Sequence, residues 1–573
     1  MGLGCSSLPS RTFFVLSLVA VGNASPMLRL TASTVGPVSV TAGASTTATV
    51  EAYNAGDGKL TPRLTSSVPW IGASAGAPRA CSSRPGLCTP LLFTLSSAGL
   101  PAGNSTGVVT VSDSDPKTVD APQTITVTLL IGGSVPSSVD VYVPPGGTRD
   151  LPFTANSQIH SAITTQDGGA WLSLALDGAG SFVFPVPYRI HLAPPASMPL
   201  GTYTGAVVTS GSNFAPDNKR IPVTMRLTDG PIAQGPAGRF RARLAQGATP
   251  LSATIPLTSV GLGSLTVASA AASGGAWLTA TAYPGGAALN LDAGTLDTGV
   301  YSGSVTINSN AVNGAITVPV DFEVVVKGPP LINYQGVVDN GTFGAGDALA
   351  RGDIAVVKGE QLSFAKVTLG QAAPLATQIG GAQVMVNGAP APMYYSTYGQ
   401  LAFQMPFETP LGTALVEVQR DGVAGNTVSV QVADRAPRLL LIGVGAYGAI
   451  VNTDGSIPMP EGSIPGVGTH PAEVGDTLTM YAIGLGRTSP AVASGQPSPA
   501  AEPLARLTET PVVNIGGGIG GTLVTPLFAG LSPNYAGLYQ VNVTIPGNVP
   551  HGIVSLSLVF PDSVSNPVEI AIE

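Results

Sequence analysis

The sequence predicts an all-β protein made of tandem β-sandwich domains. The chain has 573 residues, which is more than a single hydrophobic core organises, so we expect several domains. It contains 73 glycines and 51 prolines but only 10% charged residues, and 44% of its residues are hydrophobic. Abundant turn formers between runs rich in Val, Thr and Ser favour short strands joined by tight loops. An internal repeat also supports this prediction.

Each of the three tryptophans opens a similar segment. Trp70 lies in PWIGASAG, Trp171 in AWLSLALDG and Trp277 in AWLTATAYPG. One aromatic residue recurring in each unit of about 100 residues is typical of an immunoglobulin-like sandwich, where the ring fills the space between the two sheets. We therefore expect these tryptophans to be structural core residues.

A G-x-x-x-G segment that runs into a β-rich stretch follows each tryptophan. The copies are GNSTGVVTV, GTYTGAVVT and GVYSGSVTI, and their first glycines, Gly103, Gly201 and Gly299, are 98 residues apart. The glycines are expected to mark the tight turn that feeds the strand. Fixed spacing of this kind indicates tandem repeats. The predicted immunoglobulin-like repeats are residues 25–132, 133–230 and 231–328.

The first of these segments also fits G-x-S-x-G, the pattern around the nucleophilic serine of many esterases. Ser105 occupies the serine position, but it aligns with Tyr203 and Tyr301 of the other repeats, so the position does not call for a nucleophile. A nucleophile elbow also needs a helix after the serine, whereas Val108 and the residues that follow it favour a strand. The sequence therefore predicts a strand here and no catalytic residue.

The tryptophan segment and the later Y-[ST]-G-x-[VA] strand resemble the BACON-like group of bacterial immunoglobulin-like domains. The third repeat, with AWLTATAYPG and GVYSGSVTI, resembles this group best. Such domains occur beside carbohydrate-active enzymes and on secreted proteins. The resemblance implies a β-sandwich and says little about function.

The remaining C-terminal half contains a second duplication. Gln400 and Pro406 in GQLAFQMP match Gln540 and Pro546 in LYQVNVTIP, because both segments read Q-x5-P. The second copy carries a longer insertion. Further matched pairs are Gly352 with Gly475, Gly412 with Gly552, and Asn426 with Asn566. The predicted β-units are residues 329–437 and 438–573.

Several segments of this half resemble an uncharacterised C-terminal domain family that is abundant in soil acidobacteria. They are INYQGVVDNGTF, GGAQVMVNGAPAPMYYSTYGQLAFQMP, VGDTLTMYAIGLG and AGLYQVNVTIP, in that order over residues 331–573. Members of that family usually end large secreted proteins, behind variable immunoglobulin-like, propeller or enzyme modules. The resemblance implies a bacterial secreted protein and assigns no activity.

The N-terminus has the pattern of an export signal. Arg11 precedes the apolar run FFVLSLVAVG, residues 13–22, and small residues follow, so we expect a signal peptide over residues 1–24 with cleavage after Ala24. MGLGCS also fits a myristoylation motif, but the apolar core of an export signal follows it directly. Cys5 would suit a lipoprotein, but no apolar segment precedes it. No later apolar run is long enough to span a bilayer. We expect a secreted protein, extracellular or periplasmic.

Two cysteines remain after removal of this signal. Cys81 and Cys88 lie in CSSRPGLC, and an exported protein meets oxidising conditions, so we expect a disulfide across this loop. Two free thiols are the alternative. No histidine or second cysteine pair lies nearby, which disfavours a metal site.

The sequence gives little support to catalysis or to cofactor binding. None of the four histidines has a metal-ligand partner at a recognised spacing, and we expect no metal and no cofactor. The net charge is -8 and no run of Lys and Arg occurs, so nucleic acid is not an expected partner. The RGD at Arg351 to Asp353 aligns with a turn of the sister unit and is read as a turn entering a strand.

We expect a secreted, non-enzymatic, multi-domain immunoglobulin-like protein that serves as an adhesion, spacer or ligand-binding array. The alternative is a carbohydrate-binding protein that uses one of its sandwiches, and Tyr394 and Tyr398 are candidates for stacking on a sugar ring. A secreted hydrolase is the third, disfavoured class, because no nucleophile, base and acid cluster in the sequence. The expected partner is an extracellular glycan or a cell-surface protein.

Overall fold

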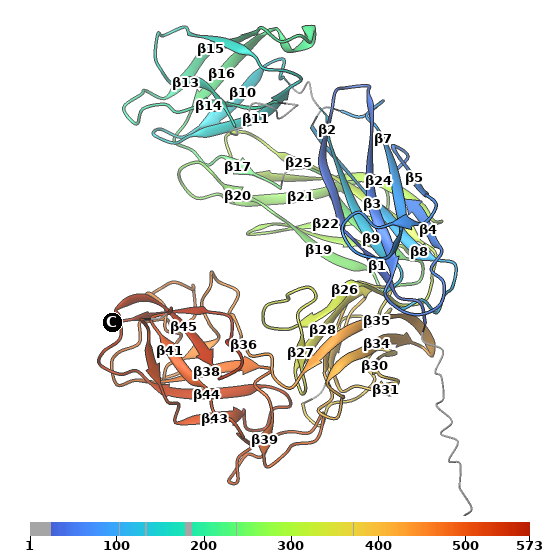
Figure 1. The fold of residues 1–573 in the computed structure, drawn as a ribbon. Coiled ribbons are helices and arrows are strands. Elements are labelled where there is room, and N and C mark those ends of the chain that lie inside the picture. The colour runs from blue at the N-terminus through green and yellow to red at the C-terminus, as the bar shows by residue number, and fades with distance from the viewer. Residues whose placement is uncertain are drawn as a thin grey trace, which may run out of the picture.

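The computed structural model describes residues 25–101, 103–131, 135–177, 186–236, 238–370, 372–518 and 520–573. The predicted signal peptide, residues 1–24, lies outside the described residues. Within them the chain is all-β, and its single helical element is one 3-10 turn, η1 (Ala215–Asp217). Figure 1 shows the successive sheets along the chain. Pairs of these sheets enclose five separate core clusters of buried apolar side chains.

The first sandwich shows how alternation in sequence builds these cores. In β9 (Gln123–Ile131) every second residue is buried, which places one face of the strand against the core and the other toward solvent. One sheet has the order β2 (Thr34–Val40), β9, β8 (Gly103–Asp113), β4 (Pro62–Ser66). The facing sheet has the order β1 (Leu28–Leu30), β3 (Ser45–Asn54), β7 (Leu87–Ser96), β5 (Ile71–Ala75), with β6 (Arg79–Ala80) paired to β7.

The second and third sandwiches repeat one topology. In the second, the sheets are β10 (Val139–Val143), β16 (Arg220–Leu227), β15 (Gly201–Ser210), β12 (His160–Thr165) and β11 (Arg149–Ala155), β14 (Val186–Leu192), β13 (Leu172–Leu176). In the third, they are β18 (Phe240–Ala245), β25 (Ile316–Val325), β24 (Gly299–Ser309), β21 (Val267–Ser273) and β19 (Leu251–Pro256), β23 (Gly286–Leu291), β22 (Leu278–Tyr283). β17 (Ala233–Gln234) pairs with β20 (Thr258–Ser259) beside them.

All three tryptophans pack into the cores of their own sandwiches. Trp171 and Trp277 are buried, and Trp70 is half-buried against the first core. Their indole N–H groups need partners, and Trp171 donates to Asp167 while Trp277 donates to the carbonyl of Gly274. Trp277 also stacks on Phe322, with 5.5 Å between ring centroids.

The glycines of the G-x-x-x-G segments have two different roles, which corrects our expectation that they mark a turn. The first glycine opens the strand with a positive φ, for example 105° at Gly103 and 154° at Gly299. The second glycine lies inside the strand, beneath the tryptophan ring. A Cβ at Gly107, Gly205 or Gly303 would lie 3.2 to 3.4 Å from a ring carbon of Trp70, Trp171 or Trp277.

The residue between these glycines is structural in the second and third repeats. The Tyr203 hydroxyl donates to the carbonyl of Pro199 at 2.8 Å, and Tyr301 donates to Asp297 at 2.9 Å. This resembles the tyrosine corner of immunoglobulin-like sandwiches. Ser105 holds the same position in β8, within a strand and with no helix after it, so the nucleophile elbow is excluded.

The C-terminal half forms two further sandwiches, here called unit 1 and unit 2. Unit 1 has the sheets β26 (Leu331–Asp339), β28 (Ile354–Glu360), β33 (Gln400–Gln404), β32 (Met393–Ser396), β29 (Thr368–Leu369) and β27 (Leu349–Ala350), β35 (Val423–Ala433), β34 (Gly412–Arg420), β30 (Ala382–Val386), β31 (Ala389–Pro390). In unit 2, one sheet is β42 (Thr522–Val524), β41 (Val512–Ile515), β45 (Gly552–Val559), β46 (Val568–Ile572). The other is β36 (Arg438–Leu439), β38 (Thr477–Ile483), β44 (Tyr539–Thr544), β43 (Phe528–Leu531), β40 (Arg506–Leu507), β39 (Thr488–Ser489), with β37 (Ile450–Val451) on β38.

Matched asparagines make the same contacts in the two units. The side chain of Asn426 accepts from the amide of Ile332 and donates to its carbonyl, at 2.7 and 3.0 Å. Asn566 does the same with Leu439, at 2.8 and 3.0 Å. Asn426 lies in the last strand of unit 1 and Asn566 lies directly before the last strand of unit 2, and each is bonded to the first strand of its unit.

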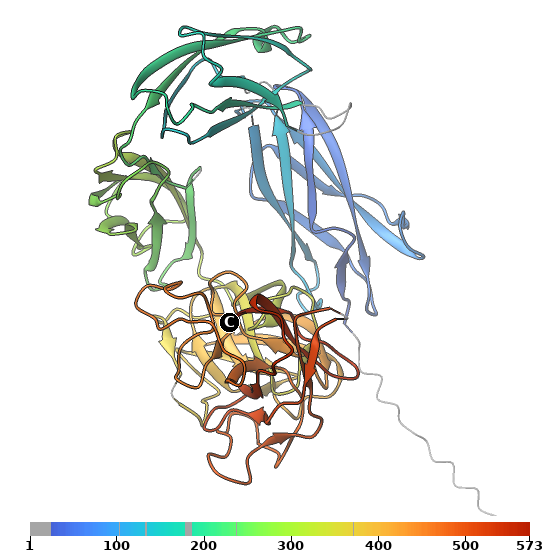
Figure 2. The same ribbon diagram turned by 90° about the vertical axis from the view of Figure 1, so that its left-hand side faces the viewer.

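The chain folds back on itself. The first sandwich lies against unit 1, where Asp120 hydrogen-bonds Ser429, and the third sandwich also contacts unit 1, where the amide of Ala245 donates to the hydroxyl of Tyr398. Figure 2 shows the result, in which the three sandwiches and the C-terminal half form a closed ring. Residues far apart in the sequence thus meet at two junctions.

Candidate functional site

The junction between the third sandwich and unit 1 forms a cleft of about 700 Å³. Thr249 and Leu251 line it from the third sandwich, and Lys366, Val367 and Tyr398 line it from unit 1. The walls are held together by the hydrogen bond from Thr249 Oγ1 to the carbonyl of Phe364, 2.7 Å long, and by the ion pair of Arg243 with Glu360. Both walls are therefore fixed relative to each other.

The cleft continues onto the outer face of the sheet β19-β23-β22. A second hollow of about 520 Å³ lies there, and Ser252 and Asn290 line both. Alternation turns Ile255 and Leu289 into the core and leaves hydroxyl, amide and small side chains outside. The strand register arranges these outer residues in two rows across the sheet, which are Ser252, Asn290, Thr279 and Thr254, Ala288, Thr281.

The small side chain of Ala288 at the centre of its row makes the face concave. Thr254 and Thr281 stand on either side of it, on the two edge strands. We call this continuous surface the Asn290 groove. It offers hydroxyl and amide hydrogen-bonding groups and one cation, Lys366, at its cleft end.

The same face of the second sandwich has a different chemistry. Its rows are Asp150, His191, Ser173 and Pro152, Arg189, Ala175. The charged groups there satisfy one another, because His191 bonds Asp150 at 2.6 Å and Arg189 pairs with Asp177 at 3.2 Å. The hydrogen bond from His191 lowers the pKa of Asp150. Equivalent sheets therefore carry rows of self-paired charged side chains in one repeat and rows of uncharged side chains in the next.

The two tyrosines predicted to stack on sugars lie at domain junctions. The Tyr394 hydroxyl donates to the carbonyl of Ala536 in unit 2, at 3.0 Å. Tyr398 stacks on Phe364, with 6.0 Å between centroids, and burial raises its pKa to about 12. The structure brings Tyr398 to the cleft and places Tyr394 against unit 2.

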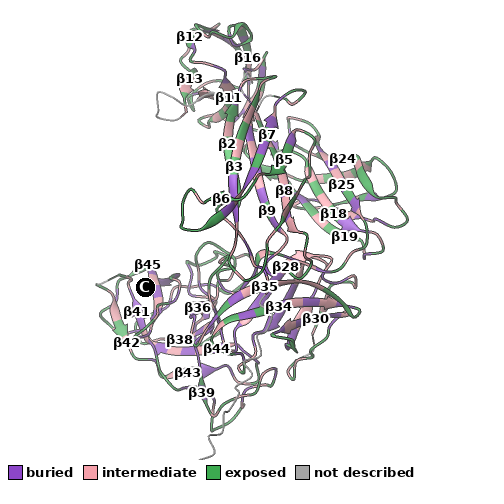
Figure 3. Ribbon diagram, turned by 45° about the vertical axis from the view of Figure 1, so that its right-hand side comes forward, coloured by how far each residue is buried: buried purple, intermediate pink, exposed green. Residues whose placement is uncertain are grey.

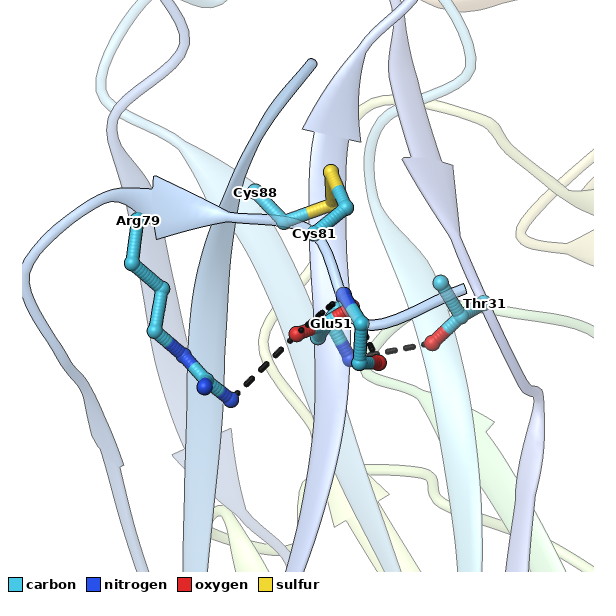
Figure 4. Close-up of a disulfide and its surroundings, with 6 residues drawn as sticks. Thr31, Glu51, Arg79, Cys81 and Cys88 are labelled. Atoms are coloured by element: carbon cyan, nitrogen blue, oxygen red, sulfur yellow. Dashed lines mark hydrogen bonds and ion pairs between the residues drawn. A yellow bond between two sulfur atoms is a disulfide. The ribbon is translucent and has the colours of Figure 1, made fainter. Parts of the chain in front are cut away.

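The two cysteines form a disulfide that closes the hairpin between β6 and β7 (Figure 4). Buried Glu51 holds the base of this hairpin by accepting hydrogen bonds from the amide and hydroxyl of Ser82, at 2.9 and 2.8 Å. These bonds, helped by Arg79, hold the pKa of Glu51 below its usual value. The hairpin itself is largely exposed (Figure 3).

A polar cluster in unit 2 was not identified from the sequence. His470 Nε2 lies 2.8 Å from Ser456 Oγ and 3.0 Å from Asp454 Oδ2, and its Nδ1 lies 2.7 Å from the carbonyl of Pro471. In a catalytic triad the serine and the carboxylate use different ring nitrogens. In this cluster Ser456 and Asp454 both bond the same ring nitrogen, Nε2, and Ser456 also donates to Asp454. The cluster therefore links two turns, and we call it the clip. Bonding to Asp454 raises the pKa of His470.

The other sequence candidates are separated or buried. His160 lies on β12 and His191 on β14, which belong to different sheets of the second sandwich. The RGD lies in a turn that enters β28, as expected, and Asp353 is wholly buried there. Burial raises its pKa to about 8. Within the described ranges, no three or more His, Cys, Asp or Glu side chains gather as they would around a metal ion.

No protein-family model matches the chain, and no curated protein matches it in sequence. Among solved structures it is similar to an endo-fucoidan hydrolase of glycoside hydrolase family 107, at 13% identity and a TM-score of 0.15, over 53% of this chain and 45% of that one. The chain thus spans less than half of the hydrolase.

Two other solved structures are themselves tandem arrays. Sidekick-1 immunoglobulin domains 1–5 are matched at 11% identity and a TM-score of 0.20, over 96% and 98% of the two chains. Cadherin domains 1–4 of protocadherin gamma B7 are matched at 10% identity and a TM-score of 0.15, over 65% of this chain and 92% of that one. The described part of the chain contains no helix long and apolar enough to cross a membrane.

Proposed function

We propose that this chain is an exported, non-enzymatic array of immunoglobulin-like sandwiches that binds an extracellular ligand in the Asn290 groove. The observation that carries the proposal is the continuity of the groove from the outer sheet of the third sandwich into the cleft with unit 1. A concave surface with a few convergent polar groups is the usual form of a binding site. Its walls are fixed by contacts between domains, which lowers the entropy cost of binding.

The groove chemistry favours one class of ligand, an extended carbohydrate. Ser252, Asn290 and Thr279 can exchange hydrogen bonds with sugar hydroxyls, and each lies on a different strand at the same register. Ala288 leaves space for a ring above the sheet. Tyr398 supplies an aromatic edge at the cleft end, although its hydroxyl already accepts from Ala245.

The export proposal rests on the N-terminal pattern and is supported by the disulfide, because such bonds persist in oxidising compartments. We also propose that residues 331–573 belong to the C-terminal family that they resemble. The equivalent contacts of Asn426 and Asn566 support a true duplication in this half.

Glycan-array binding of the mature chain, residues 25–573, tests the proposed function. Substituting Ala288→Trp fills the centre of the groove from the solvent side and should reduce binding at least about tenfold, the effect of losing roughly 1.4 kcal/mol, with an unchanged melting midpoint. Arg189→Trp, at the equivalent position of the second sandwich, is the matched control and should leave binding intact. Binding that survives Ala288→Trp would remove the groove from the proposal.

A further inference from the structure

One edge of unit 1 is completed by a different domain. β27 pairs with β35 at Val432 and Ala433, and the edge of β35 that precedes these residues faces the first sandwich. There the carbonyl of Thr427 accepts from the amide of Asp120 at 2.9 Å, and the amide of Ser429 donates to Asp120 Oδ1 at 2.6 Å. A single aspartate of the first sandwich thus satisfies the carbonyl of Thr427 and the amide of Ser429 at the edge of β35.

Asp120 is held in place for this contact. It is 2% exposed and adopts a φ of 57°, which is uncommon outside glycine. Its second carboxylate oxygen accepts from the Ser429 hydroxyl at 2.8 Å and pairs with Arg29. Arg29 also donates to the Ser429 hydroxyl at 3.2 Å. We call Arg29 and Asp120 the plug, and Thr427 and Ser429 the socket.

Unit 2 covers the corresponding edge with its own chain. Counted from the matched asparagines Asn426 and Asn566, Glu569 is the counterpart of Ser429. The amide of Glu569 donates to the carbonyl of Ala446 at 2.8 Å, and its carbonyl accepts from the amide of Gly448 at 3.2 Å. The covering segment lies between Leu439 and Gly475, a stretch that is longer than its counterpart between Ile332 and Gly352 in unit 1. Within the described residues, the corresponding edge of unit 1 is covered by the first sandwich, a domain that is distant in sequence.

An unpaired strand edge is a template for another chain, and a docking element carried on a separate domain can be exchanged between copies. We propose that the socket of unit 1 is a homophilic docking site that accepts the Arg29–Asp120 plug of a second copy of this chain. This inference goes beyond the proposed ligand binding and names a different partner, a second copy of the chain. The contact is polar and of limited extent, which suits a reversible association.

The same geometry explains why the closed single chain dominates over exchange between two chains. The plug and socket of one chain are tethered through the intervening sandwiches, so the effective concentration for ring closure is set by the geometry of this tether, which holds the two in contact in the closed ring. Ring closure therefore outcompetes a second copy at low protein concentration. Exchange between chains becomes visible when each chain is prevented from closing on itself.

Complementary variants test this directly. Asp120→Ala removes the carboxylate of the plug and keeps the socket, whereas Ser429→Asp keeps the plug and places a second carboxylate opposite Asp120. Each variant alone should sediment as an open monomer, with a lower sedimentation coefficient than the wild type. An equimolar mixture at about 100 µM, within reach of weak protein contacts, should form a species of twice the monomer mass. Asp57→Ala, at an exposed site of the same sandwich, should behave as the wild type.

Two results would overturn the inference. One is a mixture that remains monomeric although both variants are folded by thermal melting and open by sedimentation. The other is an Asp120→Ala chain that stays as closed as the wild type, because the plug would then not hold the ring. The assay contains no ligand, so a negative result leaves the groove proposal standing, and a failed glycan assay leaves this inference standing.

Discussion

Gly303 lies directly beneath Trp277, and a Cβ on this glycine would come within 3.2 Å of the ring and 2.4 Å of the Ser273 carbonyl. Trp171 and Gly205, and Trp70 and Gly107, have the same relationship in the other repeats. Each of the first three sandwiches therefore depends on a large ring and an absent side chain at paired positions. The first glycine of each segment serves the turn, and the second serves the core.

Gly303→Ala should destabilise the third sandwich by about 1–3 kcal/mol, because the strand or the ring must shift to admit the methyl group. Gly72→Ala is the control, since a Cβ there meets Thr94 at an ordinary 3.6 Å. Calorimetry of the mature chain should show one lowered transition for Gly303→Ala and none for Gly72→Ala. Equal effects of the two substitutions would contradict the packing described here.

Trp277→Ala should cost about 3–5 kcal/mol, the range for removing a large buried aromatic side chain. The loss should fall mainly on the third sandwich, because the buried residues of its core cluster all belong to that sandwich, although Phe364 and Tyr398 of unit 1 pack against it. Hydrogen exchange resolved by segment can check this, with faster exchange expected in β19 and β23. Unchanged protection there would show that Trp277 is not a core residue.

Asp353 should make stability fall as pH rises. Its folded pKa of about 8 results first from burial, with Asp339 adding to the effect, and it exceeds the unfolded value of about 3.9. Between these values the folded state holds a proton that the unfolded state has released, so stability decreases by about 1.4 kcal/mol per pH unit. Asp353→Asn should make the melting midpoint less dependent on pH between pH 5 and 8, and Asp57→Asn should not. Parallel curves for Asp353→Asn and the wild type would refute this role.

The disulfide should contribute about 2–3 kcal/mol at most, because it closes a short loop. Replacing both Cys81 and Cys88 with Ser should lower the midpoint of the first sandwich and leave the other transitions in place. Alkylation of the native secreted protein should label neither thiol. Labelling of both without prior reduction would contradict a formed bond.

Local patterns in the sequence predicted the strands, the tryptophan positions and the duplication of the C-terminal half. Those features depend on alternation and spacing between near neighbours, which a single sequence displays. The Asn290 groove could not be foreseen, because its rows depend on the register of three strands around Ala288. Ring closure could not be foreseen either, since Asp120 and Ser429 are isolated polar residues in unrelated segments. The Asp454–Ser456–His470 clip likewise arises from two turns that meet only in the fold.

Small-angle X-ray scattering of the mature chain tests the closed ring most directly. The ring is held by the hydrogen bonds between Asp120 and Ser429 and between Tyr398 and Ala245. We therefore expect a compact particle whose pair-distance distribution matches the ring of Figure 2. Asp120→Ala should increase the radius of gyration and lengthen the maximum dimension. A wild-type profile of an elongated rod, unchanged by Asp120→Ala, would contradict closure of the chain on itself.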